Sequence, residues 1–221
     1  ATEMEPIGAR KLLPLFDEPA FRTKFSVSVT TASKFTVLSN MPVAKTQSMD
    51  GARTRTDFQE TPSMSSYLLA LAVGEFEKIS DTHKGVALNI YTTPGKAANA
   101  ATAMQWTKSI LNYMDDYFGI GYALPKLDQI AIPGKRGAME NWGLITYAED
   151  LLVFDPKTIN ADSKYWAFNI IAHEIAHQWF GNLVTMSWWD TLWLNESFAS
   201  WMAVKTTTAL MPQFNAELRN I

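Results

Sequence analysis

The chain has 221 residues, long enough for one domain or two small ones with a sizeable core. Hydrophobic residues make up 47% and charged residues 19% of it, a balance typical of folded globular proteins and not of disordered ones. The net charge is −3 and Lys and Arg form no run, so nothing indicates a nucleic-acid partner. The longest apolar stretches, such as residues 67–74, are too short to span a bilayer, so we expect no membrane segment in this chain.

The sequence contains no cysteine and only three histidines. Disulfides and thiolate metal sites are therefore excluded, and any metal must be held by His, Asp or Glu. Residues 1–5 show neither an initiator methionine nor an apolar targeting segment. We expect a piece of a longer soluble protein, whose compartment the sequence leaves open.

The first part of the chain shows the pattern of strands separated by turns. Residues 24–30 alternate apolar and polar side chains, as a half-buried strand does. Turn-forming residues then separate four further strand-like segments, 35–38, 53–58, 66–77 and 86–92. We expect residues 1–93 to form an antiparallel sheet unit.

The pattern changes at Pro94-Gly95, where we place the one domain boundary. Residues 96–118 are Ala-rich and then periodic, which predicts a long amphipathic helix ended by glycines. Strands are expected at 127–132 and 143–147, around a glycine-bearing stretch. Two more helices are expected, one from an N-cap at Asp162 or Ser163 to about Phe180 and one over 195–210. The predicted fold class is α+β, with residues 94–221 as the second unit.

The segment His173-Glu174-Ile175-Ala176-His177 lies in the first of these two helices. Side chains four positions apart share a helix face, so both imidazoles can reach one tetrahedral zinc. Glu174 cannot easily bind the same ion, but it can take a proton from a water on it and pass it to a leaving amine. The alternative is a helix that merely carries two histidines. The apolar residues around the segment favour the metal, because buried ionisable groups need a partner.

A third ligand is needed, and Glu196 opens the next predicted helix, nineteen positions after His177. A helix, a turn and a returning segment fit this interval. Glu196 is equally explained as a first-turn acid that stabilises the helix dipole, and both can be true. Leu183 excludes the class of zinc site that would need a histidine there. Asp190 is a candidate for orienting an imidazole, but it is explained at least as well as a solvated loop acid. His83 is expected in an exposed turn.

These residues together resemble the zinc aminopeptidases of the aminopeptidase N type, also called gluzincin aminopeptidases. The matching segments are Gly137-Ala138-Met139-Glu140-Asn141, residues 173–177 and Asn195-Glu196, with similar flanks at 9–19 and 179–185. The resemblance covers essentially the whole chain. It implies a β-saddle domain, whose later part would be residues 1–93, followed by the first part of a thermolysin-like catalytic domain.

The resemblance also implies residue roles. One zinc per chain would be held by His173, His177 and Glu196, with Glu174 as the general base. Glu140 would bind the free α-amino group of a peptide, assisted by Glu5, which is assigned by its place ahead of Ala9-Arg10. The neighbouring segment would line the peptide groove through Gly137, Ala138, Met139 and Asn141. From the residues alone, Glu140 is better explained as a loop acid near two basic residues.

The implied activity is removal of the N-terminal residue from peptides by attack of zinc-bound water. Members of the family also use a tyrosine several tens of residues beyond the third ligand. Only 25 residues follow Glu196 and none is Tyr, while Tyr147 and Tyr165 do not match that position. We therefore expect the chain alone to be weakly active or inactive and to associate with itself. Two alternatives are an endopeptidase with the same metal site and a scaffold that has lost catalysis. The preferred N-terminal side chain is not determined.

Overall fold

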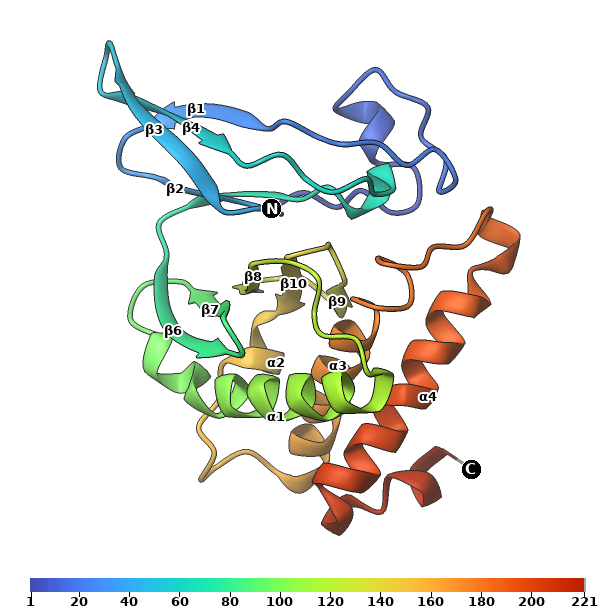
Figure 1. Ribbon diagram of the computed structural model, residues 1–221. Helices are drawn as coiled ribbons and strands as arrows, with labels where there is room; N and C mark the ends of the chain where they lie inside the picture. Colours follow the sequence, from blue (N-terminus) through green and yellow to red (C-terminus); the bar gives the residue numbers. More distant parts are fainter. Residues whose placement is uncertain (221) are drawn as a thin grey trace.

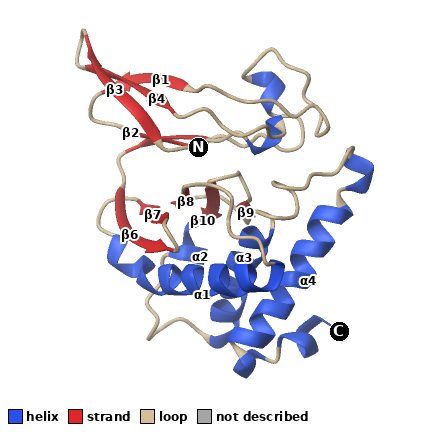
Figure 2. Ribbon diagram, viewed as in Figure 1, coloured by secondary structure: helices blue, strands red, loops and turns tan. Residues whose placement is uncertain are grey.

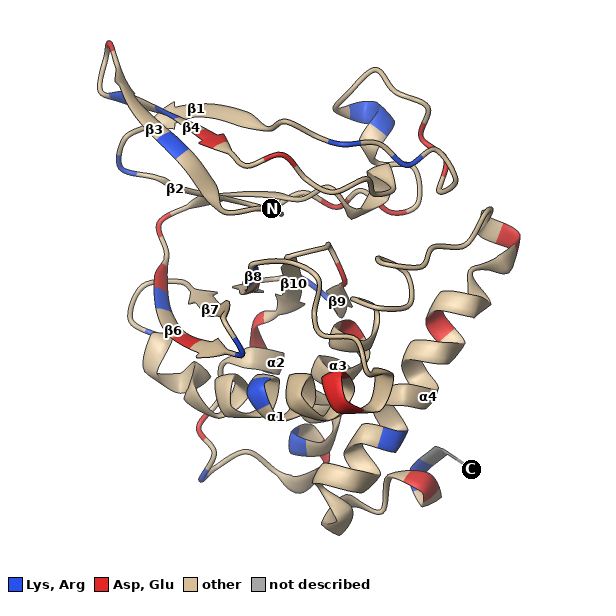
Figure 3. Ribbon diagram, in the orientation of Figure 1, with Lys and Arg blue, Asp and Glu red and all other residues tan. Residues whose placement is uncertain are grey.

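Two sheet-bearing units lie one above the other in the computed structural model, which describes residues 1–220 (Figure 1). Loops occur in both units, and the longer helices gather in the second (Figure 2). The described class is α+β, as predicted. Basic and acidic residues are interspersed over both units (Figure 3). No helix among the described residues is both long and apolar enough to cross a membrane.

The first unit contains two antiparallel sheets. One has the strand order β1-β4-β3 and the other pairs β2 with β5. Every residue of β3 is exposed, so this strand lacks the alternation by which the others were predicted. The elements are η1 (Ala9–Lys11), β1 (Ser28–Ala32), β2 (Thr36–Ser39), β3 (Val43–Met49), β4 (Arg53–Phe58), η2 (Ser66–Leu68) and β5 (Leu71–Gly74).

The second unit is built on a five-stranded mixed sheet in the order β6-β7-β8-β10-β9. The helices lie on the side of this sheet away from the first unit (Figure 1). Its elements are β6 (Glu77–His83), β7 (Val86–Thr92), η3 (Ala97–Ala100), α1 (Ala101–Phe118), β8 (Lys126–Ile132), β9 (Ala138–Met139), β10 (Leu144–Ala148), α2 (Glu149–Leu152), α3 (Ala161–Ala176), η4 (Trp189–Thr191), α4 (Trp193–Leu210), η5 (Pro212–Phe214) and η6 (Ala216–Asn220).

The pairing of β6 and β7 differs from the sequence-based expectation. Residues 77–92 were expected to belong to the antiparallel sheet of the first unit. In the structure they form a hairpin whose second strand pairs in parallel with β8, across the connection through α1. A hairpin leaves a local turn signal in the sequence, whereas a parallel partner beyond a helix leaves none. Residues 77–92 thus share a sheet with the strands that follow α1.

Helix α3 is placed by its cap and by its packing. The side chain of Asn160 accepts a hydrogen bond from the backbone N–H of Ser163 at 2.8 Å, so the N-cap lies two residues before the predicted Asp162. Phe168, Ile171 and Ile175 are fully buried in the main core. Burying each such side chain contributes about 1.5–3 kcal/mol. The helix that ends in the His173–His177 segment is therefore held firmly against its neighbours.

Candidate metal and peptide site

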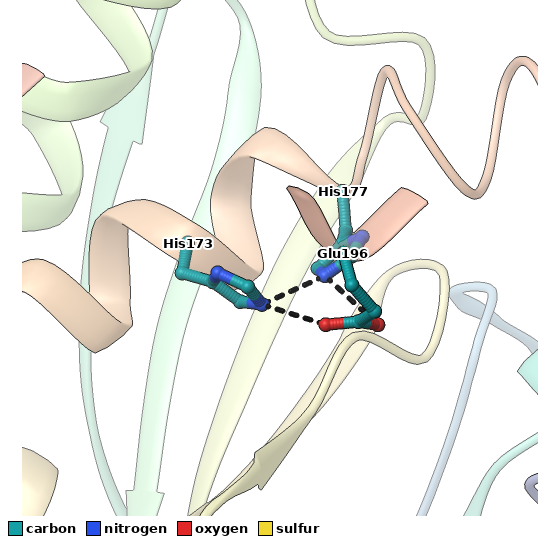
Figure 4. A group of neighbouring side chains, drawn as sticks. All are labelled: His173, His177 and Glu196. Atoms are coloured by element: carbon teal, nitrogen blue, oxygen red, sulfur yellow. Dashed lines mark hydrogen bonds and ion pairs between the residues drawn. The ribbon is translucent and has the colours of Figure 1, made fainter. Parts of the chain in front are cut away.

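Three candidate ligands converge from the end of α3 and the start of α4 (Figure 4). His173 lies in the last turn of α3, His177 is its C-cap, and Glu196 is in the first turn of α4. The two Nε2 atoms are 2.9 Å apart. Nε2 of His173 is 3.3 Å from Glu196 Oε2, and Nε2 of His177 is 3.6 Å from Glu196 Oε1. The structure thus brings together all three predicted ligands.

The spacing of these atoms suits a tetrahedral zinc. Zinc binds His nitrogen and carboxylate oxygen at about 2.0–2.2 Å, which puts neighbouring ligand atoms roughly 3.3 Å apart. Nδ1 of His177 donates to the carbonyl oxygen of Phe180 at 2.9 Å, so in the neutral ring the lone pair lies on Nε2. Two imidazoles and one carboxylate leave one coordination position for water or substrate. The residues present therefore fit the metal that the resemblance implies.

The charges around His177 favour a cation at the same point. Burial lowers the pKa of His177, but the negative charges of Glu140, Glu174 and Glu196 outweigh it and raise that pKa to about 10. Burial raises the pKa of Glu196, but its hydrogen bonds with the two histidines outweigh this and hold the pKa well below the usual range. A positive charge among these acids is thus strongly stabilised.

Glu174 lies beside the ligands and faces inward. Glu174 is only 6% exposed, and its Oε2 is buried without a hydrogen-bond partner among the described residues. Burial raises the pKa of this carboxyl well above its ordinary value. A buried carboxylate oxygen without a donor indicates a partner outside the chain, such as a water. The arrangement suits a group that accepts a proton.

A second cluster of acidic side chains adjoins the metal site. Glu5 comes from the first unit, and Glu140 and Glu196 come from the second. Carboxylate oxygens of Glu5, Glu140 and Glu196 lie within 4.8 Å of one another. Glu140 follows β9 and is 4% exposed, and one oxygen of Glu140 and one of Glu5 are buried without a partner among the described residues. Burial and the charges of Glu140 and Glu196 raise the pKa of Glu5 to about 8. Three carboxylates so placed can surround a ligand cation.

Strand β9 offers an edge beside this acidic group. It pairs only with β10 and ends the sheet order, so its other side can accept an extended peptide. Gly137 is exposed and Ala138 partly exposed, whereas Met139 and Asn141 are buried. The side chains of Met139 and Asn141 are therefore packed inside the protein and are not exposed at this edge.

Comparison with known proteins follows the two units. Residues 102–220, over half of the chain, match the family described as the Peptidase family M1 domain. The chain belongs to peptidase family M1. In addition, residues 1–68 of this M1 chain match the Peptidase M1 N-terminal domain. Members of this family are metallopeptidases.

Named relatives of the M1 chain are aminopeptidases. Glutamyl aminopeptidase of Bos taurus is 48% identical over 202 residues, which are 90% of this chain and 21% of that protein. Probable aminopeptidase 1 of Sulfurisphaera tokodaii is 45% identical over 217 residues, covering 98% and 27%. Aminopeptidase N of Acetobacter pasteurianus is 43% identical over 203 residues, covering 91% and 57%. The chain thus spans about a fifth of the length of its mammalian relatives.

One expectation about histidine surroundings in the M1 chain is wrong, and of the two explanations for Asp190 the structure favours the solvated loop acid. His83 is not in an exposed turn: it is buried, and its Nε2 is 2.8 Å from Oδ2 of Asp115. The sequence around His83 is typical of a turn and gives no sign of this contact, because the partner, Asp115, lies far along the chain on α1. Asp190 is exposed and has no hydrogen bond to an imidazole among the described residues. Instead, the carbonyl oxygen of Phe180 orients His177, and Ser200 Oγ lies 3.4 Å from Nδ1 of His173.

Residues that no motif pointed to hold the site of the M1 chain in place. Gln178 and Asn182 donate to the carbonyl oxygen of Glu140, at 3.2 and 2.9 Å. From the first unit, the hydroxyl of Tyr67 donates to the carbonyl oxygen of Gly181 at 3.3 Å. Of these residues, only Asn182 could have been indicated by the sequence, because it lies in the flank 179–185 that follows the His173–His177 segment. Tyr147 is fully buried, so its hydroxyl is not presented to a peptide in the cleft.

Proposed function

We propose that this chain carries the zinc site and the amine-binding site of an aminopeptidase. The observation that carries the proposal is the placing of Glu5 and Glu140 beside Glu196, directly next to the two-histidine site. A metal site alone would suit many hydrolases. A buried acidic group beside it suits a substrate that brings its own positive charge.

The chemistry follows from the positions of the acids. When bound, zinc supplies a Lewis acid that makes a water more acidic and polarises the scissile carbonyl. Glu174 takes the proton of the attacking water and later delivers it to the leaving amine. Its buried, unpartnered oxygen and its raised pKa suit this role.

The substrate class follows from the acidic group. The ammonium group of a peptide N-terminus lies between the carboxylates of Glu140 and Glu5, and the chain continues along the edge of β9 past Gly137 and Ala138. Because the anchor is at a fixed distance from the metal ligands, only the first peptide bond reaches the water. The substrates are therefore peptides with a free N-terminus.

The domain assignment is part of the same proposal. The first unit is the later part of a β-saddle domain, and the second is the first part of a thermolysin-like catalytic domain. The boundary was predicted near residue 93. The shared sheet of β6, β7 and β8 favours a boundary near residues 75–76, between β5 and β6.

The test compares two peptides in the natural full-length protein. One has a free N-terminus, and the other is the same peptide with an acetylated N-terminus. We expect hydrolysis of the first bond of the free peptide only, loss of activity after chelation, and recovery with one equivalent of zinc. Internal cleavage of both peptides at similar rates would indicate an endopeptidase instead. A full complement of zinc without hydrolysis of either peptide would indicate a scaffold.

A further inference from the structure

The four residues that begin at Glu140 have every backbone carbonyl bound. Asn182 and Gln178 donate to the carbonyl of Glu140, and the N–H of Leu144 donates to that of Asn141 at 3.0 Å. The carbonyl of Trp142 accepts from the side chain of Asn40, and that of Gly143 accepts from the side chain of Lys126 and from the N–H of Asp128 at 3.1 Å. A buried backbone with every acceptor bound has one position. The backbone that carries the Glu140 side chain is therefore restrained.

Asn40 reaches this segment from the first unit, just after β2. It is buried, and its Nδ2 donates to the carbonyl oxygens of Trp142 at 2.9 Å and Leu68 at 2.7 Å. Its Oδ1 accepts from the N–H of Ala70 at 2.9 Å. One amide hydrogen thus binds the Glu140 segment, while the other hydrogen and the oxygen hold Asn40 within the first unit.

Lys126 makes a second link at the start of β8. Its buried Nζ donates to the carbonyl oxygens of Ser39 at 2.9 Å and Gly143 at 2.7 Å, and lies 2.8 Å from Oδ2 of Asp128. The two backbones also come very close, because a Cβ on Gly143 would clash with the carbonyl oxygen of Asn40. Gly143 has φ +84°, which a side chain disfavours.

We propose that Asn40 and Lys126 are positioning residues that set the place of the Glu140 carboxylate relative to the metal ligands. The proposal rests on the proposed function. Through these two side chains, the unit that supplies Glu5 also fixes Glu140. On the other side, Gln178 and Asn182 tie the same segment to the end of the metal-binding helix. A shift of about 1 Å in such a group can cost a hundredfold, so a loosened link should weaken recognition of the amine.

The test measures amine recognition without relying on turnover. An amino-acid hydroxamate and the same hydroxamate without its amino group both bind the metal, but only the first carries the ammonium. Calorimetry on the zinc-loaded full-length protein gives the ratio of their affinities. We expect Asn40→Ala and Lys126→Met to lower this ratio about tenfold or more, with nearly unchanged binding of the amine-free compound and unchanged zinc content. Lys126→Arg, which keeps donors, should restore part of the ratio.

Ser39→Ala is the matched control. Ser39 is buried next to Asn40, but its hydroxyl donates to the carbonyl of Ala70 inside the first unit and not to the Glu140 segment. We expect it to lower thermal stability and leave the affinity ratio unchanged. Asn40→Ser, which keeps a shorter donor, replaces Asn40→Ala if that variant does not fold.

The outcomes separate this inference from the proposed function. An unchanged ratio in the Asn40 and Lys126 variants would overturn it, as would an equal loss of affinity for both hydroxamates. Glu140→Ala is measured in parallel. If Glu140→Ala leaves the ratio unchanged, the amine anchor itself is wrong. If Glu140→Ala lowers the ratio and the Asn40 and Lys126 variants do not, only the positioning role is wrong.

Discussion

At the scale of single residues, contacts within the chain orient the proposed metal ligands. The carbonyl oxygen of Phe180 fixes the ring of His177, and Ser200 lies beside the ring of His173. Such outer contacts set which ring nitrogen faces the metal. Glu174, between the two histidines in sequence, is left with an oxygen that no donor satisfies among the described residues.

We predict that His177→Ala abolishes tight zinc binding. The change leaves one imidazole and one carboxylate, which is too few protein ligands for a catalytic zinc site. Metal content after dialysis, measured by mass spectrometry, should fall from one zinc per chain to nearly none. His83→Ala is the control, since it removes the histidine outside the site and should keep the zinc. Full zinc content in His177→Ala would exclude His177 as a ligand.

We predict that Glu174→Gln keeps the zinc and loses hydrolysis in the full-length protein. The amide has nearly the same shape but cannot accept the proton of the attacking water. Loss of a general base lowers the rate by about a hundred- to ten-thousandfold. Steady-state kinetics on a peptide with a free N-terminus measure kcat, and metal analysis checks the site. Turnover close to that of the unchanged enzyme would remove Glu174 from the mechanism.

At the scale of elements, a buried polar pair fixes the end of β6 against α1. His83 is the last residue of β6, and Asp115 lies near the end of α1. Oδ1 of Asp115 also accepts from the N–H of Tyr122 at 3.0 Å, in the loop that leads to β8. One carboxylate thus joins β6, α1 and the loop that leads to β8.

We predict that His83→Ala destabilises the fold without affecting the metal site. The change deprives a buried carboxylate oxygen of its close partner, which costs about 1–3 kcal/mol. The free energy of unfolding is measured by urea denaturation of the chain. Lys84→Ala is the control, because Lys84 is half-exposed and 3.4 Å from the same oxygen. Equal effects of the two substitutions would show that the buried pair contributes no more than a surface contact.

At the scale of the whole molecule, the face beside the third ligand is apolar and open. A groove of about 390 Å³ lies between α4 and residues 180–186. Val184 is 60% and Trp193 61% exposed at this groove. Exposed large apolar residues that cluster in this way mark a surface that contacts other protein. The chain also covers only about a fifth of its mammalian relatives.

We predict that the 221-residue chain binds zinc but is a poor catalyst by itself. The proposed ligands, base and amine anchor are all among the described residues, yet the groove beside them is open. Loss of one group that stabilises the oxyanion typically costs about 10²–10³ in rate. Both forms, the short chain and a natural full-length one, are loaded with zinc and compared on an aminoacyl chromogenic substrate. Equal turnover would mean that the short chain holds a complete active site.

We also predict that the isolated chain associates with itself through this groove. Sedimentation velocity over a range of concentrations should show dimers or larger species at high concentration. Trp193→Ser should weaken the association, because it removes apolar area at the groove. Phe35→Ser is the control, because Phe35 is an exposed residue of the first unit away from the groove. It should have no effect on the association. A chain that stays monomeric throughout would contradict the prediction.

Much of the site could be predicted because its signals are local. The spacing of His173, Glu174 and His177 is a property of one helix turn, so the sequence alone indicates a shared face. Most strands and helices were likewise found from periodicity, and β4 and β7 occur at the predicted residues. The exposed strand β3 lacks periodicity and was missed, as were β6, except for its first residue, and the two-residue β9.

Long-range partners depended on the tertiary structure. Parallel pairing of β7 with β8, the buried contact of His83 and the links from Asn40 and Lys126 join residues that no pattern connects. By itself the sequence determined which side chains could bind a metal, since helix geometry fixes neighbours four residues apart. Only the folded chain decided that Glu5 lies beside Glu140, because burial and backbone hydrogen bonding select one packing of the two units.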